Sequence, residues 1–151
     1  MRRDNREKIK KVCFEIFEQL AFMFAEEIDI DEIQGGDEPF IHAAMSFSGN
    51  TSGSIDITMP VSLASQLAKN ILGLDESENL DRQHYEDAVC ELLNTICGRM
   101  LTSLFGEDAV FDLHVPSTQG IEAQHLHELF SSGDCIAFSV EDAPVLVRTF
   151  L

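Results

Sequence analysis

Apolar residues recur with helical spacing over two long stretches of this chain. In residues 6–27 they return every three or four positions, at Cys13, Ile16, Phe17, Leu20, Met23 and Phe24. The same spacing recurs in residues 81–105, where Asp81 and Gly106 suit the two ends of a helix. The pattern predicts two long amphipathic helices, each with one face in the core.

Alternating apolar and polar residues predict strands between these helices. Residues 40–48 and 53–59 alternate in this way, and the Gly49–Gly53 segment between them is typical of a hairpin turn. A phosphate-binding loop is the competing interpretation of this turn. It is disfavoured because the segment lacks the Lys and the following helix that a phosphate site requires.

A shorter helix and three further strands complete the pattern. The helix is predicted to begin at Ser62 as its cap and to end at Leu72, before Gly73. Residues 107–115 are predicted to contain one strand, in which Val110, Phe111, Leu113 and Val115 alternate and which Pro116 ends. The other two strands are predicted over residues 135–140 and 144–150. Residues 117–133 fit no single pattern, and within them Ala123–Phe130 suits either a helical turn or a strand.

Four residues of the second long helix form a line on its surface. Asp87, Glu91, Asn94 and Gly98 fall within about 60° of one another around the helix axis, and apolar residues occupy the opposite side. We call these four residues the polar ridge. The simplest interpretation is the solvated face of an amphipathic helix. However, Asn is a poor helix former, so an Asn at a helix centre suggests a further role.

Composition and charge restrict the class of protein. The chain has 151 residues and is 44% hydrophobic, which is enough for one core and predicts a single domain over residues 1–151. With 10 Lys and Arg against 27 Asp and Glu, the net charge of −17 disfavours binding to nucleic acid or to anionic membranes. No apolar run of membrane-spanning length and no signal peptide are apparent, so we expect a cytoplasmic protein.

The cysteines and histidines give little indication of a metal or redox site. The four cysteines are widely spaced and form no Cys-x-x-Cys motif, which predicts reduced thiols within the core. His125 and His127 form a His-x-His pair that could offer two imidazoles to a metal. Because no carboxylate or thiolate with ligand spacing accompanies them, we expect neither a metal nor a cofactor.

The two long helices match when the first is shifted by 76 residues onto the second. Their apolar positions coincide, Glu15 falls on Glu91, and Glu18 falls on Asn94. The match suggests two helix–strand–strand halves related by a pseudo-two-fold axis, although two unrelated amphipathic helices would also match in apolar phase. Only the second helix carries the carboxamide.

The polar ridge and a later proline resemble the signature of the CheC and CheX chemotaxis phosphatases. That signature has an Asp or Ser, a Glu four residues on, an Asn three further and a Pro about two dozen residues beyond, here Asp87, Glu91, Asn94 and Pro116. The likeness spans most of the chain and is weakest over residues 117–133. Because Glu18 replaces the amide of a second site, the chain is more like CheX than CheC.

The resemblance implies an α+β fold in which long helices pack on an antiparallel sheet. It also implies a protein phosphatase that hydrolyses the aspartyl phosphate of a CheY-like response regulator, with Mg²⁺ carried by the regulator. Asn94 would position the attacking water and Glu91 would pair with the regulator's active-site Lys. Asp87 and Gly98 would contribute to partner binding, and the protein would be a homodimer.

Two other functions remain open at this stage. The first is a non-catalytic docking module of the same fold, comparable to the middle domains of flagellar switch proteins. The second is a homodimeric scaffold that associates through exposed aromatic residues and strand edges.

Overall fold

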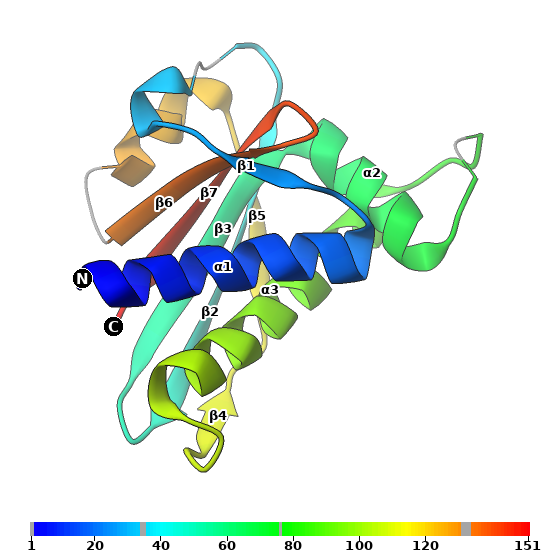
Figure 1. Ribbon diagram of the computed structural model, residues 1–151. Coiled ribbons are helices and arrows are strands. Elements are labelled where there is room, and N and C mark those ends of the chain that lie inside the picture. The colour runs from blue at the N-terminus through cyan, green and yellow to red at the C-terminus, as the bar shows by residue number, and fades with distance from the viewer. Residues whose placement is uncertain (1, 34–35, 76, 131–133) are drawn as a thin grey trace.

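The computed structural model describes residues 2–33, 36–75, 77–130 and 134–151. Within these residues, α helices lie on one face of a seven-stranded antiparallel sheet (Figure 1). The helices are α1 (Arg3–Ala21), α2 (Val61–Leu72) and α3 (Arg82–Phe105), with 3₁₀ helices η1 (Ile30–Glu32) and η2 (Ala123–Phe130). The strands are β1 (Ala25–Glu27), β2 (Phe40–Gly49), β3 (Gly53–Pro60), β4 (Phe111–Leu113), β5 (Ser117–Ile121), β6 (Asp134–Val140) and β7 (Ala143–Phe150).

The order of the strands shows that the fold is built from two related halves. The sheet runs β1-β6-β7-β3-β2-β4, and β5 also pairs with β2. In the first half, α1 is followed by an edge strand, η1 and the pair β2–β3, while in the second half α3 is followed by edge strands, η2 and the pair β6–β7. Each half contributes its edge strand to the central pair of the other half. This exchange confirms the predicted pseudo-two-fold repeat of helix–strand–strand units and the α+β fold class.

Side chains pack into separate cores on the two faces of the sheet. The larger core joins the apolar faces of α1, α2 and α3 to alternate residues of β2, among them Ile41, Ala43 and Met45. The smaller core lies on the other face, where Phe40 packs with Leu126 of η2. Because successive strand residues point to opposite faces, neighbouring residues of β2 serve different cores.

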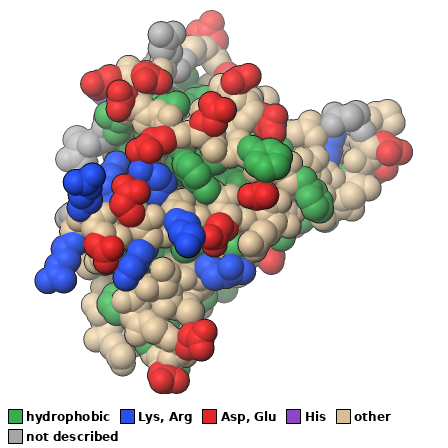
Figure 2. All heavy atoms as spheres, viewed as in Figure 1, with side chains coloured by type: hydrophobic (Ala, Val, Ile, Leu, Met, Phe, Trp, Pro, Cys, Tyr) green, Lys and Arg blue, Asp and Glu red, His purple; other side chains and the backbone are tan. Residues whose placement is uncertain are grey.

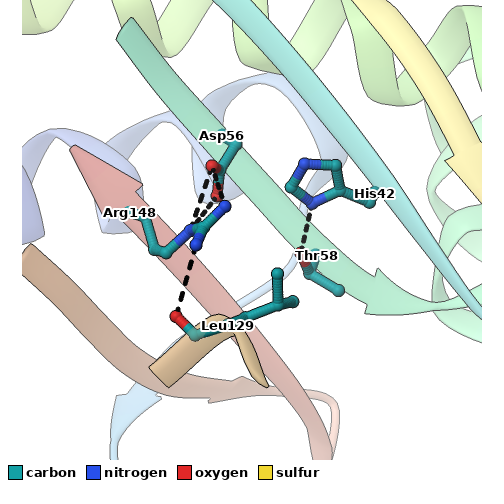
Figure 3. A network of polar contacts seen from close by, with 5 residues as sticks. All are labelled: His42, Asp56, Thr58, Leu129 and Arg148. Carbon is teal, nitrogen blue, oxygen red and sulfur yellow. Dashed lines mark hydrogen bonds and ion pairs between the residues drawn. The ribbon is translucent and has the colours of Figure 1, made fainter. Parts of the chain in front are cut away.

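Polar residues on the second face fasten η2 to the sheet (Figure 3). Asp56 and Arg148 form a buried ion pair with an Nη2–Oδ2 distance of 2.7 Å, and Arg148 Nη1 donates to the Leu129 carbonyl of η2. Beside them, His42 Nδ1 lies 2.9 Å from Thr58 Oγ1, and burial lowers the pKa of His42. These groups satisfy one another in a site from which water is largely removed.

The first helix is shorter than the sequence predicted. It ends at Ala21 because Phe22 adopts the left-handed conformation, with φ of 58°, and the amides of Phe22 and Met23 bond back to the Glu18 and Phe17 carbonyls. Residues 25–27, predicted as helix, form β1 instead. Phe24 was predicted to lie on the apolar face, but it is 68% exposed.

The turns and the ends of the remaining elements mostly lie where the sequence predicts them. The hairpin around Gly49–Gly53, the final hairpin and the end of α2 at Gly73 are confirmed. The Ser62 cap is wrong, because α2 begins after Pro60 and the Glu38 carboxylate accepts the Ser62 amide hydrogen bond at 3.0 Å.

The segment after α3 differs more from the predicted pattern. The strand predicted within residues 107–115 is present but short, since only residues 111–113 pair in the sheet, as β4. Of residues 117–133, which fit no single sequence pattern, the first part is strand β5 and Ala123–Phe130 is a 3₁₀ helix. Residues 131–133 lie outside the described residues. Among the described residues, no helix combines the length and apolarity needed to cross a membrane.

Candidate functional site

Helix α3 is held firmly at its start and along its apolar face. Asp81 caps it with a reciprocal pair of bonds: its carboxylate accepts from the His84 amide at 3.0 Å, and its own amide donates to His84 Nδ1. Its inner face is buried against the sheet and against α1 and α2 at Ala88, Val89, Leu92, Leu93, Ile96, Cys97, Met100 and Leu101. The opposite face therefore has a fixed position on the surface.

The polar ridge lies on this outer face, as the sequence predicted. Asp87, Glu91 and Asn94 are exposed, and Gly98 is half-buried. Residues three or four apart on a helix are neighbours, so the Glu91 carboxylate and the Asn94 carboxamide project side by side. The structure thus brings together the four residues that the sequence assigned to the site.

The ridge side chains differ in their polar contacts. Gln83 Nε2 donates to Asp87 Oδ1 at 2.7 Å, so one side chain from the preceding turn orients the Asp87 carboxylate. Among the residues that the structure describes, none makes a polar contact with the side chain of Glu91 or Asn94. A carboxylate and a carboxamide therefore face solvent with their hydrogen-bonding capacity unused.

Gly98 has no structural reason to lack a side chain. A Cβ atom built there would meet only Leu113 Cδ1, at 4.0 Å, which is ordinary van der Waals contact. Glycine inside a helix costs about 1 kcal/mol relative to Ala, so an open surface at this point is maintained at some cost to the helix. Gly98 leaves a notch at the end of the ridge.

Pro116 lies in a bulge between β4 and β5. Leu113 of β4 pairs with Phe47 and Ser117 of β5 pairs with Ala44, so the three residues between the two strands face two residues of β2. The bulge exposes 90% of Val115 and places half-exposed Leu113 next to Gly98. The sequence pattern missed these exposed apolar neighbours because strict alternation placed both Leu113 and Val115 on a buried face.

The groove between α1 and α3 carries positive charge on an otherwise acidic protein. Lys8 and Lys11 line it from α1 with the Glu15 carboxylate, and Arg99 lines it from α3, next to Gly98. Figure 2 shows basic side chains gathered along α1, whereas acidic side chains are spread over the rest of the face in view. A partner that approaches the ridge therefore meets cations on one side of it.

Thiol chemistry is an unsuitable explanation for this site. Cys90 lies one residue from Glu91, but burial raises the pKa of its thiol, and the Asp87 and Glu86 carboxylates raise it further. All four cysteines are free, and burial raises the pKa of Cys97 to about 11. These thiols remain protonated and poorly nucleophilic at neutral pH.

The histidine pair does not assemble a metal site in the described part of the chain. His125 lies in η2 near the Glu122 and Glu128 carboxylates, on the other side of the sheet from α3. Within the described residues, no three His, Cys, Asp or Glu side chains come together as a metal-binding group. The chemistry available on the ridge itself is hydrogen bonding by an amide and ion pairing by carboxylates.

Comparison with known proteins identifies a family with this fold. The family model described as chemotaxis phosphatase CheX matches residues 41–136, which include α3 and the bulge. The structure of CheX from Vibrio vulnificus is 19% identical with a TM-score of 0.72, and the match covers 99% of this chain and 97% of that one. A search of curated protein sequences gives no match.

Two further structures have the same fold. CheX from Desulfovibrio desulfuricans is 19% identical, with a TM-score of 0.69 over 98% of each chain. The CheX chain in the CheX–CheY–BeF₃–Mg²⁺ complex from Borrelia burgdorferi is 19% identical, with a TM-score of 0.67 over 99% of this chain and 98% of that one. Because the family model covers well over half of its residues, this chain belongs to the CheX family of chemotaxis phosphatases.

Proposed function

We propose that this protein hydrolyses the aspartyl phosphate of a CheY-like response regulator, with Asn94 and Glu91 as the residues that act on the substrate. The observation that carries the proposal is the exposed pair on α3, a carboxamide and a carboxylate without partners among the described residues. Membership of the CheX family and the existence of a CheX–CheY complex in Borrelia burgdorferi support it.

The proposed reaction needs little covalent chemistry from the enzyme. The oxygen of a water molecule attacks phosphorus, the bond between phosphorus and the aspartyl oxygen breaks, and the regulator regains its carboxylate as phosphate leaves. An acyl phosphate is already activated, so placement of the water in line with the breaking bond supplies most of the acceleration.

Asn94 suits the task of placing that water. Its carboxamide oxygen accepts a hydrogen bond from the water, and its NH₂ group donates to a phosphoryl oxygen or to the water oxygen. A carboxylate at the same position would add negative charge beside the phosphoryl group. The neutral amide avoids this repulsion and keeps both hydrogen-bonding functions.

Glu91 suits the task of holding the regulator in register. Its carboxylate would pair with the regulator's active-site Lys, one helical turn from Asn94. Asp87, oriented by Gln83, extends the contact surface, and the notch at Gly98 allows close approach of the partner's backbone. The cations of the α1–α3 groove would favour association with an acidic regulator surface.

The metal in this proposal belongs to the substrate protein. Mg²⁺ bound by the regulator would neutralise the phosphoryl oxygens during transfer, so this chain needs no cofactor of its own. We also propose that the protein acts in the cytoplasm as a homodimer, which sedimentation velocity would test.

The proposal is tested by measuring phosphate release from a receiver domain that has been phosphorylated with acetyl phosphate in the presence of Mg²⁺. Wild-type protein should accelerate release, and Asn94→Ala should lower the accelerated rate about 100-fold, the typical loss for one stabilising hydrogen-bonding group. Gln19→Ala removes an exposed amide from α1 and serves as the control. An unchanged rate for Asn94→Ala would remove this residue from the mechanism.

Docking without hydrolysis is the alternative function. All ridge residues that would contact a regulator are also suited to binding alone. In that case the wild-type protein would bind the phosphorylated receiver domain without accelerating loss of phosphate, and Glu91→Gln would weaken binding while Asn94→Ala would not.

A further inference from the structure

Two exposed phenylalanines follow the end of α1. Phe22 is 73% exposed and Phe24 is 68% exposed, while Met23 between them is buried. The chain thus anchors itself through Met23 and presents the two neighbouring rings to solvent. Exposed aromatic pairs of this kind contribute nothing to the core and are typical of contact surfaces.

Unusual backbone conformations converge at the same place. Among the described residues, the non-glycine positions with positive φ are Phe22 at 58°, Glu141 at 50° and Asp142 at 66°. The pairing of β1 with β6 places Ala25 opposite Val140, so the Glu141–Asp142 turn follows directly beside Phe24. Gly, Asn and Asp adopt this conformation readily, so Asp142 is an ordinary residue for it, whereas the presence of Phe22 and Glu141 suggests selection for their side chains.

A shallow hollow joins the aromatic and acidic groups. Phe24, Glu26, Ser139, Glu141 and Asp142 line it. Within the described ranges, no cation pairs with Glu26, Glu141 or Asp142, whereas the adjacent Glu27 binds Lys10 at 2.7 Å. Figure 2 shows hydrophobic side chains in the middle of this face with acidic side chains around them.

We propose that this aromatic–acidic patch, formed by Phe22, Phe24, Glu26, Glu141 and Asp142, binds a segment of a partner protein in which Lys or Arg lies next to an apolar residue. A guanidinium or ammonium group can pack on the face of a Phe ring while it pairs with the unpaired carboxylates. The neighbouring apolar residue of the segment then covers the second ring.

Charge complementarity favours this occupant over a second copy of the chain. A symmetric dimer would place the same patch on both sides of the interface and would bring Glu26, Glu141 and Asp142 close to their own copies. Three carboxylates from each copy would then face one another, so an interface at this patch would be repulsive. A basic segment neutralises the same carboxylates.

Selection from a random dodecapeptide library displayed on phage tests the proposal with the full chain as target. Recovered peptides are then measured by fluorescence anisotropy against wild type and against the double variant Phe22→Ser/Phe24→Ser. We expect Lys or Arg within three positions of Leu, Ile, Phe or Met, and at least tenfold weaker binding to the double variant. Leu151→Ser, which alters an exposed apolar residue elsewhere, should bind as wild type does.

A second variant separates charge from aromatic contact. Glu141→Gln/Asp142→Asn should weaken binding and flatten its salt dependence, with circular dichroism showing an unchanged fold.

Three results would overturn the proposal: no peptide is enriched, the enriched peptides are acidic, or the Phe22→Ser/Phe24→Ser variant binds the peptides as tightly as wild type. A wild-type dimer that becomes monomeric in that variant would overturn it in favour of a second copy. Phosphate release should be the same in every variant, which separates this surface from the polar ridge.

Discussion

Helices α1 and α3 begin the two halves of the fold and pack against each other. They differ in the residues on their outer faces. In the 76-residue register their inner faces are equivalent, because Val12, Cys13, Ile16 and Phe17 are buried like Ala88, Val89, Leu92 and Leu93. The apolar match is therefore a shared structural role. On the outer faces the equivalent positions are Lys11 and Asp87, Glu15 and Glu91, Glu18 and Asn94, and Phe22 and Gly98.

The outer faces differ in both charge and shape. Glu15 lies 3.9 Å from Lys11 in an ion pair, whereas Glu91 has no side-chain partner among the described residues. α1 ends before Phe22, which is left-handed, whereas α3 continues past Gly98 to Phe105. The duplicated fold thus supplies two similar platforms, and three outer positions decide which one carries an amide, a free carboxylate and a notch.

Copying the α1 residue onto α3 should give the largest effect. Asn94→Glu should lower the rate of phosphate release from a phosphorylated receiver domain about 100-fold. The substitution replaces the water-placing amide with a carboxylate, whose negative charge repels the phosphoryl oxygens. Single-turnover kinetics with excess phosphatase would measure this loss. The free energy of unfolding should change by less than about 0.5 kcal/mol, since the side chain is exposed.

The reciprocal change on α1 is the matched control. Glu18→Asn restores an amide to α1 but leaves Glu15 paired and α1 ended before Phe22, so it should create no second site. If Glu18→Asn in the Asn94→Glu background restored phosphate release, the amide alone would define a site and the comparison of the two outer faces would fail.

The free carboxylate should have the next largest effect. Glu91→Gln should weaken binding of the receiver domain by about 30-fold, equivalent to about 2 kcal/mol for a hydrogen bond to a charged group. Titration by isothermal calorimetry with a beryllofluoride-activated receiver domain would measure it at several salt concentrations.

Glu15→Gln provides the control for that experiment, because it removes the equivalent carboxylate from α1. It should leave the affinity unchanged. Equal losses from Glu15→Gln and Glu91→Gln would indicate a general effect of net charge in place of a specific pairing at Glu91.

Much of the fold could be predicted because long amphipathic helices and hairpins leave strong local patterns. α3 was located within one residue of its observed start, and the hairpins followed from alternation and turn residues. The end of α1 could not be predicted, because Met23 and Phe24 continue the helical apolar pattern while the backbone turns left-handed at Phe22. Nothing in the residue type signals that conformation.

The polar ridge was predictable because all four residues lie on one helix, where sequence spacing fixes their relative positions. Its surroundings come from distant segments. Leu113 reaches Gly98 only through the pairing of β4 with β2, and the bulge at Pro116 sets which neighbours are exposed. Local pattern carries no information on such long-range register, so these apolar neighbours were missed.

The notch on α3 should separate stability from partner binding. Gly98→Ala should stabilise the protein by up to about 1 kcal/mol, because Ala favours the helix and its Cβ meets only Leu113 at 4.0 Å. Thermal unfolding should show an increase in Tm of about 3 °C. Binding of the receiver domain should weaken, since the methyl group fills the notch.

Gly53→Ala is the contrasting variant, because its Cβ would collide with the Phe150 carbonyl oxygen. It should lower the Tm through strain within the sheet. A Gly98→Ala protein that was destabilised, or that bound the receiver domain more tightly, would show that Gly98 serves the fold of α3.

The smallest effect is expected at Phe22, where α1 has already ended although α3 continues past the equivalent Gly98. Phe22→Gly should stabilise the protein by about 0.5 kcal/mol, because relief of the left-handed conformation outweighs the added freedom of Gly in the unfolded chain. The lost ring is 73% exposed, so little packing is lost. Chemical denaturation should show a higher midpoint with an unchanged slope, and phosphate release should remain at the wild-type rate. A lower midpoint would mean that the ring contributes to the core, and that the chain places Phe at the end of α1 for stability and not for contact with a partner.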